Sequence, residues 1–195
     1  MHKFCNLKYT TWDINLSDIP DNVFFEQELN QAFEIAESYD APQKIGDGKS
    51  LMNSVIPNFK TFDSLYKFVV DQIQHKLEIL QIHPYYRKKL FLKRVWANRI
   101  YQNTEGTIHD HPDSLVFLLY YKAPENSSEI IFINPKYQDK MLQSHDVIPE
   151  EDKLRIPTYT GMCLLHDGAI LHAVGKHNNI ECRDVIVFEF KSVFY

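Results

Sequence analysis

The spacing of apolar residues changes near residue 90, and this change constrains the fold more than any other feature of the sequence. Apolar residues recur at helical spacing over residues 22–39 and 62–82. After residue 90 the chain is rich in β-branched and aromatic residues, in short runs separated by turn residues. The expected strands are residues 90–101, 115–121, 129–133, 161–165, 169–174 and 183–193. Helices followed by strands predict an α+β fold, mainly β, with the N-terminal helices packed on one face.

Most of the expected strands are apolar on both faces, so we expect a sheet that is covered on both sides. Many short strands separated by turns favour a sandwich or a barrel. The length of 195 residues fits one domain. We expect a helical layer over residues 1–89 and a β core over residues 90–195.

Composition excludes several classes of protein. The net charge of −5 argues against broad electrostatic binding of nucleic acid. The longest apolar run, Leu115 to Tyr121, is far too short to span a membrane. The N-terminal residues show no apolar segment of the length that a signal peptide needs. The sequence therefore predicts a cytoplasmic protein with no membrane partner.

Two histidines one residue apart form the first candidate site. In an extended chain His109 and His111 point to the same side, where two imidazoles can bind one metal ion if a third group joins them. His172, within an expected apolar strand, is the candidate for that third ligand, because a buried imidazole needs a partner. Asp113 continues the alternation and is an alternative ligand, although Pro112 can change its direction. His166 is expected in a turn, and His177 in an exposed loop.

Arg183 opens the last expected strand, eleven residues after His172. A guanidinium that points into so apolar a strand needs an anionic partner. Glu189 in the same strand is one candidate partner. The other is the carboxylate of a ligand, held by the two-pronged arginine side chain.

These motifs, in this order, resemble the iron(II)- and 2-oxoglutarate-dependent dioxygenases, and most closely a small subgroup common in phages and marine bacteria. The resemblance extends over residues 94–191. It rests on Trp96-Ala97-Asn98, Gly106, His109-Asp110-His111-Pro112-Asp113-Ser114, the apolar run to Tyr120-Tyr121, His172, Arg183 and Glu189-Phe190.

The resemblance implies a double-stranded β-helix, a jelly-roll barrel of the cupin type, with Fe(II) and 2-oxoglutarate as cofactors. His109, His111 and His172 would bind the iron; the superfamily's usual carboxylate ligand fits only in the register His111-Pro112-Asp113. Arg183 would bind the far carboxylate of 2-oxoglutarate. Val185 stands where relatives often carry a hydroxyl residue, so Tyr120 or Tyr121 would supply a hydroxyl donor. Asn98 would line the co-substrate pocket.

The implied reaction is hydroxylation of a protein side chain or a small molecule, with release of succinate and CO2. A phage origin would place the protein in the host cytoplasm. One alternative is a cupin-like three-histidine metalloenzyme that does not use 2-oxoglutarate; another is a non-catalytic binding barrel in which Arg183 pairs with Glu189. The polar segment Lys136 to Arg155 is interpreted either as a lid over the site or as a surface connection.

Overall fold

A computed structural model describes residues 7–38, 49–51, 55–77, 90–138 and 145–191 of the chain. The helices are α1 (Asn22–Ser38) and α2 (Phe62–Gln74). The strands are β1 (Tyr9–Asp13), β2 (Lys49–Leu51), β3 (Leu92–Ile100), β4 (Ser114–Lys122), β5 (Ile130–Ile133), β6 (Lys153–Ile156), β7 (Met162–Asp167), β8 (His172–Val174) and β9 (Arg183–Lys191). No helix in these ranges is long and apolar enough to cross a membrane.

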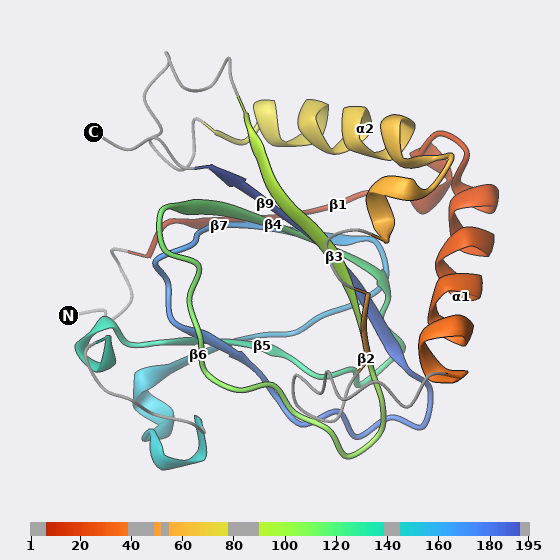
Figure 1. Cartoon of the computed structure of the whole chain (residues 1–195). Helices are drawn as coiled ribbons and strands as arrows, with labels where there is room; N and C mark the ends of the chain where they lie inside the picture. Colours follow the sequence, from red (N-terminus) through yellow and green to blue (C-terminus); the bar gives the residue numbers. More distant parts are fainter. Residues whose placement is uncertain (1–6, 39–48, 52–54, 78–89, 139–144, 192–195) are drawn as a thin grey trace.

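The strands form two sheets that lie face to face (Figure 1). The large sheet has the order β1-β7-β4-β9-β3-β2, and the small sheet has the order β6-β5-β8. Every neighbouring pair is antiparallel. This is the arrangement of a jelly roll, and it confirms the predicted α+β fold, mainly β, of the double-stranded β-helix type.

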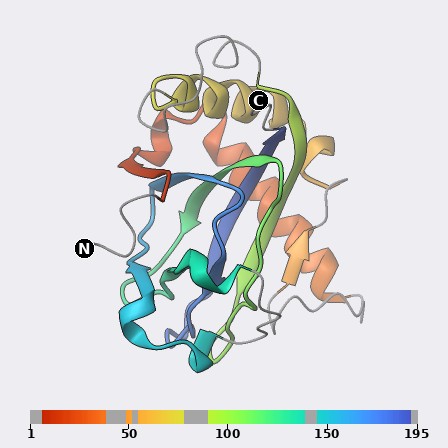
Figure 2. The same ribbon diagram turned by 90° about the vertical axis from the view of Figure 1, so that its left-hand side faces the viewer.

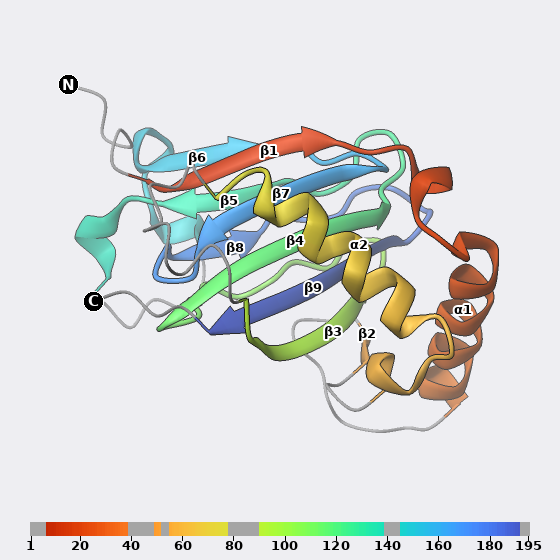
Figure 3. The same cartoon turned by 90° about the horizontal axis from the view of Figure 1, so that it is seen from above.

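Both helices lie outside the large sheet, on the side away from the small sheet (Figures 1 and 2). Figure 3 shows α2 crossing over the strands of that sheet. Side chains alternate between the two faces of β4, so this strand packs against both layers. Phe117 and Leu119 pack with the helices, whereas Val116, Leu118 and Tyr120 face the small sheet. The expected sheet covered on both sides is thus observed.

The structure has three strands that the sequence pattern did not predict, namely β1, β2 and β6. Strands β1 and β2 come from the N-terminal half, so residues 1–89 supply two edge strands as well as the helical layer. Strands β2 and β6 are short and carry polar residues such as Lys49, Lys153 and Arg155, so no apolar run marks them in the sequence. Helix α2 ends at Gln74, and the last part of the expected helix, residues 78–82, lies outside the described residues.

The segment from Lys136 to Arg155 is only partly a connection. Its last residues belong to β6, which pairs with β5, so this end is part of the small sheet and is no lid. Before β6, the buried carboxylate of Asp152 accepts hydrogen bonds from Asn134 and Lys136. Residues 139–144 lie outside the described residues. A lid role for the earlier part of the segment stays a prediction.

Candidate metal centre and its cavity

The structure brings His109, His111 and His172 together, with ligand nitrogens all within 4.8 Å of one another. His109 and His172 face each other across a short antiparallel bridge. The backbone N–H of each donates to the carbonyl of the other at 2.9 Å. Their ring centroids are 4.3 Å apart. Two segments more than sixty residues apart in sequence therefore present their imidazoles as one pair.

The position of His111 depends on Gly168. The backbone N–H of His111 donates to the Gly168 carbonyl at 2.8 Å, and the Gly168 N–H donates to the Ser114 carbonyl at 2.7 Å. A Cβ atom at residue 168 would lie less than 3.0 Å from both the His111 and Ser114 carbonyl oxygens. Glycine is required there because only a residue without a Cβ permits this close approach of backbones.

The backbone also sets the tautomers of two of the imidazoles. Nδ1 of His109 lies 2.9 Å from the Thr107 carbonyl, and Nδ1 of His172 lies 2.9 Å from the Ile170 carbonyl. A carbonyl oxygen only accepts hydrogen bonds, so each Nδ1 must carry the proton. Each Nε2 is then left with its lone pair for a metal ion, as in most protein sites with histidine ligands.

His111 has a carboxylate behind it. Its Nδ1 lies 3.8 Å from Oε2 of the fully buried Glu189. Burial alone would raise the pKa of the Glu189 carboxyl, but hydrogen bonds from Lys93, Ser114 and Arg94 outweigh it and lower that pKa. Burial, together with repulsion from His109, lowers the pKa of His111 to about 4. The imidazole is therefore neutral at physiological pH, which is the form that binds metals.

Three imidazole nitrogens fit a first-row transition metal such as iron or zinc. No carboxylate belongs to this cluster among the described residues. Asp113, the alternative ligand, is exposed in a turn with a positive φ of 58°, so the structure does not bring it to the cluster. The turn at Pro112-Asp113 breaks the strand alternation on which that alternative depended.

Two other histidines differ from their predicted environments. His166 is not in a turn but in β7 and fully buried, 5.0 Å from His172 between ring centroids and outside the cluster of ligand atoms. Burial lowers its pKa to about 3. His177 is also fully buried, because its ring bridges two backbones: Nδ1 accepts from the Ser128 N–H at 3.2 Å, and Nε2 donates to the Glu181 carbonyl at 2.7 Å. Loop composition gave no sign of that bridge.

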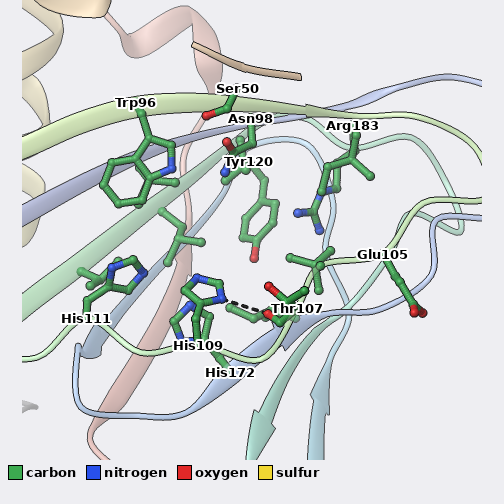
Figure 4. A pocket seen from close by; sticks show the side chains of 18 of the residues that line it. Ser50, Trp96, Asn98, Glu105, Thr107, His109, His111, Tyr120, His172 and Arg183 are labelled. Atoms are coloured by element: carbon green, nitrogen blue, oxygen red, sulfur yellow. Dashed lines mark hydrogen bonds between the residues drawn. The ribbon is translucent and has the colours of Figure 1, made fainter. Parts of the chain in front are cut away.

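The three histidines line a cavity of about 370 Å³ between the two sheets (Figure 4). Val116, Leu118, Val185 and Val187 give it an apolar wall from the large sheet. Trp96 and His111 lie at one end and Arg183 at the other. The Trp96 ring is 5.6 Å from that of His111, a contact that the sequence interpretation did not assign.

Arg183 is 1% exposed and lies at the other end of this cavity from Trp96 (Figure 4). Its Nη1 donates to the Ser128 carbonyl at 2.9 Å, whereas its Nε has no hydrogen-bond partner. In the described part of the chain Arg183 forms no ion pair. Glu189, the partner considered from the sequence, is bound by Arg94, Lys93 and Ser114 instead. Burial lowers the pKa of Arg183, which is consistent with a cation that lacks a counter-ion.

Two further polar side chains in the cavity lack partners. Tyr120 lies beside Arg183, with the guanidinium carbon 5.3 Å from the ring centroid, and its buried hydroxyl has no hydrogen bond. Burial raises the pKa of Tyr120 to about 12, so the hydroxyl keeps its proton. The buried Oδ1 of Asn98 is also without a partner.

Tyr121, the other candidate hydroxyl donor, points away from the cavity. It packs with the helices, and its hydroxyl donates to Oδ1 of Asn22 in α1 at 2.6 Å. Consecutive residues of a strand face opposite sides, so only Tyr120 or Tyr121 can reach the cavity. The sequence left both open; of the two, Tyr120 lines the cavity in the structure. The backbone carbonyls of Ser128, Thr107 and Ile170 also contact site residues. Sequence analysis did not identify them, because any residue type can supply a backbone carbonyl.

No protein-family description matches the sequence, and no curated protein matches it. Solved structures do match it in fold. AviO1 from Streptomyces viridochromogenes Tue57 has a TM-score of 0.68 at 10% identity, covering 98% of this chain and 92% of that chain. The epimerase SnoN, solved with Fe3+, alpha ketoglutarate and nogalamycin RO, has a TM-score of 0.64 at 10% identity. The match covers 97% of this chain and 81% of SnoN. HygX from Streptomyces hygroscopicus, solved with nickel and 2-oxoglutarate, has a TM-score of 0.62 at 10% identity. The match covers 98% of this chain and 85% of HygX.

At such identities the likeness establishes the fold. The chain has the fold of 2OG-Fe(II) oxygenase-family enzymes, one of which, from Burkholderia pseudomallei, is also among the matching structures. The narrower resemblance to a phage and marine bacterial subgroup stays a prediction.

Proposed function

We propose that this chain is an iron(II)- and 2-oxoglutarate-dependent oxygenase. The observation that carries the proposal is the buried Arg183 guanidinium, which has no anionic partner in the described residues and shares a cavity with three histidines. An unpaired buried cation is costly, so such a site favours an anionic ligand. 2-Oxoglutarate places a carboxylate at one end and a metal-chelating keto acid at the other.

In this proposal Arg183 binds the far carboxylate of 2-oxoglutarate. Nη1 is held by the Ser128 carbonyl, which fixes the orientation of the guanidinium, while the unpartnered Nε is available to the ligand. The Tyr120 hydroxyl keeps its proton and donates to the same carboxylate. Asn98 lines the same cavity with an unpartnered Oδ1 that accepts from a donor group. The Tyr120 hydroxyl thereby replaces the hydroxyl that Val185 does not supply.

His109, His111 and His172 would hold the iron through their unprotonated ring nitrogens. Thr107, Ile170 and Glu189 keep these rings in place, the first two through backbone carbonyls. Bound iron and 2-oxoglutarate together supply oxygen activation coupled to decarboxylation, with succinate and CO2 as products. The apolar wall of Val116, Leu118, Val185 and Val187 excludes water from the reacting centre.

The size of the cavity favours a small molecule, or one side chain of a larger one, as the substrate. Two structures of similar fold were solved with small molecules: SnoN with nogalamycin RO and HygX with hygromycin B. We propose hydroxylation as the reaction and the cytoplasm as the location.

The proposal is tested by 2-oxoglutarate turnover in the absence of a substrate. Purified protein with Fe(II), 2-oxoglutarate and oxygen should form succinate slowly. His172→Ala should abolish succinate formation, and Arg183→Met should raise the 2-oxoglutarate concentration needed for half-maximal rate by about 100-fold, because one charged hydrogen-bonded contact contributes about 3 kcal/mol. His75→Ala, an exposed histidine beyond α2, is the matched control and should behave as the wild type. Succinate formation that survives His172→Ala would refute the proposal.

A second candidate is a three-histidine metalloenzyme that does not use 2-oxoglutarate. It is favoured by one observation, the lack of any carboxylate in the ligand cluster of the described residues. Under this alternative the metal binds normally, and isothermal titration shows no 2-oxoglutarate binding to the metal-loaded protein. Binding that depends on both the metal and Arg183 would exclude it.

A further inference from the structure

A second cavity, of about 590 Å³, lies beside the first. We call it the outer cavity, and the one at the histidines the inner cavity. Glu105 lines both of them. Neighbouring residues divide between the two: Ile130 and Val174 line the inner cavity, whereas Glu129 and Gly175 line the outer one. Figure 4 shows the Glu105 carboxylate directed away from the three histidines.

Three residues that line the outer cavity carry buried polar atoms without a hydrogen-bond partner. They are Oγ of Ser127, Oγ of Ser128 and both ring nitrogens of His145. His145 is 5% exposed, with Nε2 3.8 Å from a Glu105 carboxylate oxygen and Nδ1 3.4 Å from an Asp146 carboxylate oxygen. Buried polar atoms are nearly always hydrogen-bonded in folded proteins, so four of them around one cavity point to a polar occupant.

The charges around the outer cavity largely offset one another. The charged residues that line it are Glu105, Glu129, Asp146, Arg155 and Lys176. The Arg155 guanidinium is occupied by Glu150 and Glu129, so it is not available to bind an anion. The carboxylates of Glu105 and Asp146 face His145. Neither a strongly anionic nor a strongly cationic ligand is favoured.

The remaining lining residues indicate hydroxyl groups as the ligand chemistry. Serine and asparagine side chains provide both donors and acceptors, a histidine ring provides N–H donors, and a hydroxyl satisfies both kinds of group. Among the described residues no Phe, Tyr or Trp lines the outer cavity, and the hydrocarbon surface that they contribute is limited to groups such as Pro157. An apolar or planar aromatic ligand would therefore find little apolar surface to pack against.

We propose that the outer cavity is a substrate subsite for a neutral, hydroxyl-rich group, such as a sugar ring or a polyol. The substrate then extends past Glu105 and places its reacting carbon in the inner cavity. Ser128 connects the two, because its carbonyl orients Arg183 while its unpartnered hydroxyl belongs to the outer cavity. As a statement about the substrate of an oxygenase, this inference rests on the function proposed above.

The test uses the full chain and a defined probe, methyl α-D-glucopyranoside at millimolar concentration, followed by NMR of backbone amides and histidine side chains. Shifts are expected at Ser127–Glu129, Gly175–Lys176 and the His145 ring. Ser127→Ala and His145→Gln should each weaken the apparent affinity by about fivefold to tenfold, which is the effect of one lost hydrogen bond. Ser17→Ala, an exposed serine outside both cavities, is the matched control and should have no effect.

Two results would overturn the inference. One is the absence of shifts with the glucoside; the other is shifts that are unchanged in Ser127→Ala and His145→Gln. Either result would leave a cavity that holds only water. The anaerobic Fe(II)–2-oxoglutarate absorption band, recorded on the same samples, separates this failure from failure of the proposed function. If the band is present while the glucoside does not bind, only the subsite is wrong; if the band is absent, the oxygenase proposal is wrong.

Discussion

Nδ1 of His111 lies 3.8 Å from Oε2 of Glu189, a carboxylate with no exposure to solvent. Glu189 accepts hydrogen bonds from Arg94 and Ser114 and forms an ion pair with Lys93, so one carboxylate beside a ligand histidine links its own strand β9 to β3 and β4. The cluster thus has a carboxylate in its second layer, although no described residue provides one as a direct ligand.

Glu189→Gln should therefore weaken metal binding while preserving the fold. The amide keeps the shape of the side chain but removes the negative charge that supports His111. Loss of such a supporting carboxylate weakens metal affinity by about 10- to 100-fold. Isothermal titration with Zn(II), a redox-inert probe, measures this change. An unchanged affinity would show that Glu189 serves only the Arg94 and Lys93 ion pairs.

Gly168→Ala should disturb the site through the backbone. The new Cβ atom would overlap the carbonyls of His111 and Ser114, so the turn must move and carry His111 with it. We expect a loss of about 2–4 kcal/mol in the free energy of unfolding, as for other forced backbone clashes. Denaturation in urea measures it. Gly175→Ala is the control, because its Cβ would meet neighbours at ordinary distances of 3.4 Å or more. Equal stability of both variants would contradict the backbone argument.

Tyr120→Phe and Tyr121→Phe should have opposite effects, although the residues are adjacent. Tyr120→Phe removes a hydroxyl with no partner in the fold, so it should weaken 2-oxoglutarate binding and leave stability unchanged. Tyr121→Phe removes the hydrogen bond to Asn22, so it should lower the free energy of unfolding by about 1 kcal/mol and leave 2-oxoglutarate binding unchanged. If Tyr121→Phe weakened 2-oxoglutarate binding and Tyr120→Phe lowered the free energy of unfolding, Tyr121 rather than Tyr120 would face the cavity.

The stability of the metal-free protein should fall as the pH drops below about 6.5. The folded-state pKa values of His111 and His166 are about 4 and about 3, below the ordinary value of 6.5. Between these limits the unfolded chain binds protons that the folded chain does not, so acid favours unfolding by up to about 1.4 kcal/mol per pH unit for each histidine. Urea unfolding at a series of pH values measures the slope. His166→Phe should reduce the slope by about one proton; an equal slope would show that His166 titrates normally in the fold.

The sequence predicted the layers and the histidine pair because both depend on periodicity. Strand alternation placed His109 and His111 on one side, and apolar runs gave six of the nine strands. Three features depended on contacts that periodicity does not encode: the turn that removes Asp113, the backbone bridge that buries His177, and the β7 position of His166. Which of Tyr120 and Tyr121 lines the cavity depends on which face of β4 packs against the helices, and Tyr121 lies on that face beside Asn22.

The most direct test of the central claim is an anaerobic absorption spectrum of the protein with Fe(II) and then 2-oxoglutarate. Chelation of the iron by the keto acid gives a weak visible charge-transfer band, which reports the metal site and the co-substrate together. The account predicts a band in the wild type that is absent in His172→Ala and weaker in Arg183→Met at the same 2-oxoglutarate concentration. Tight Fe(II) binding without any band in the wild type would contradict it.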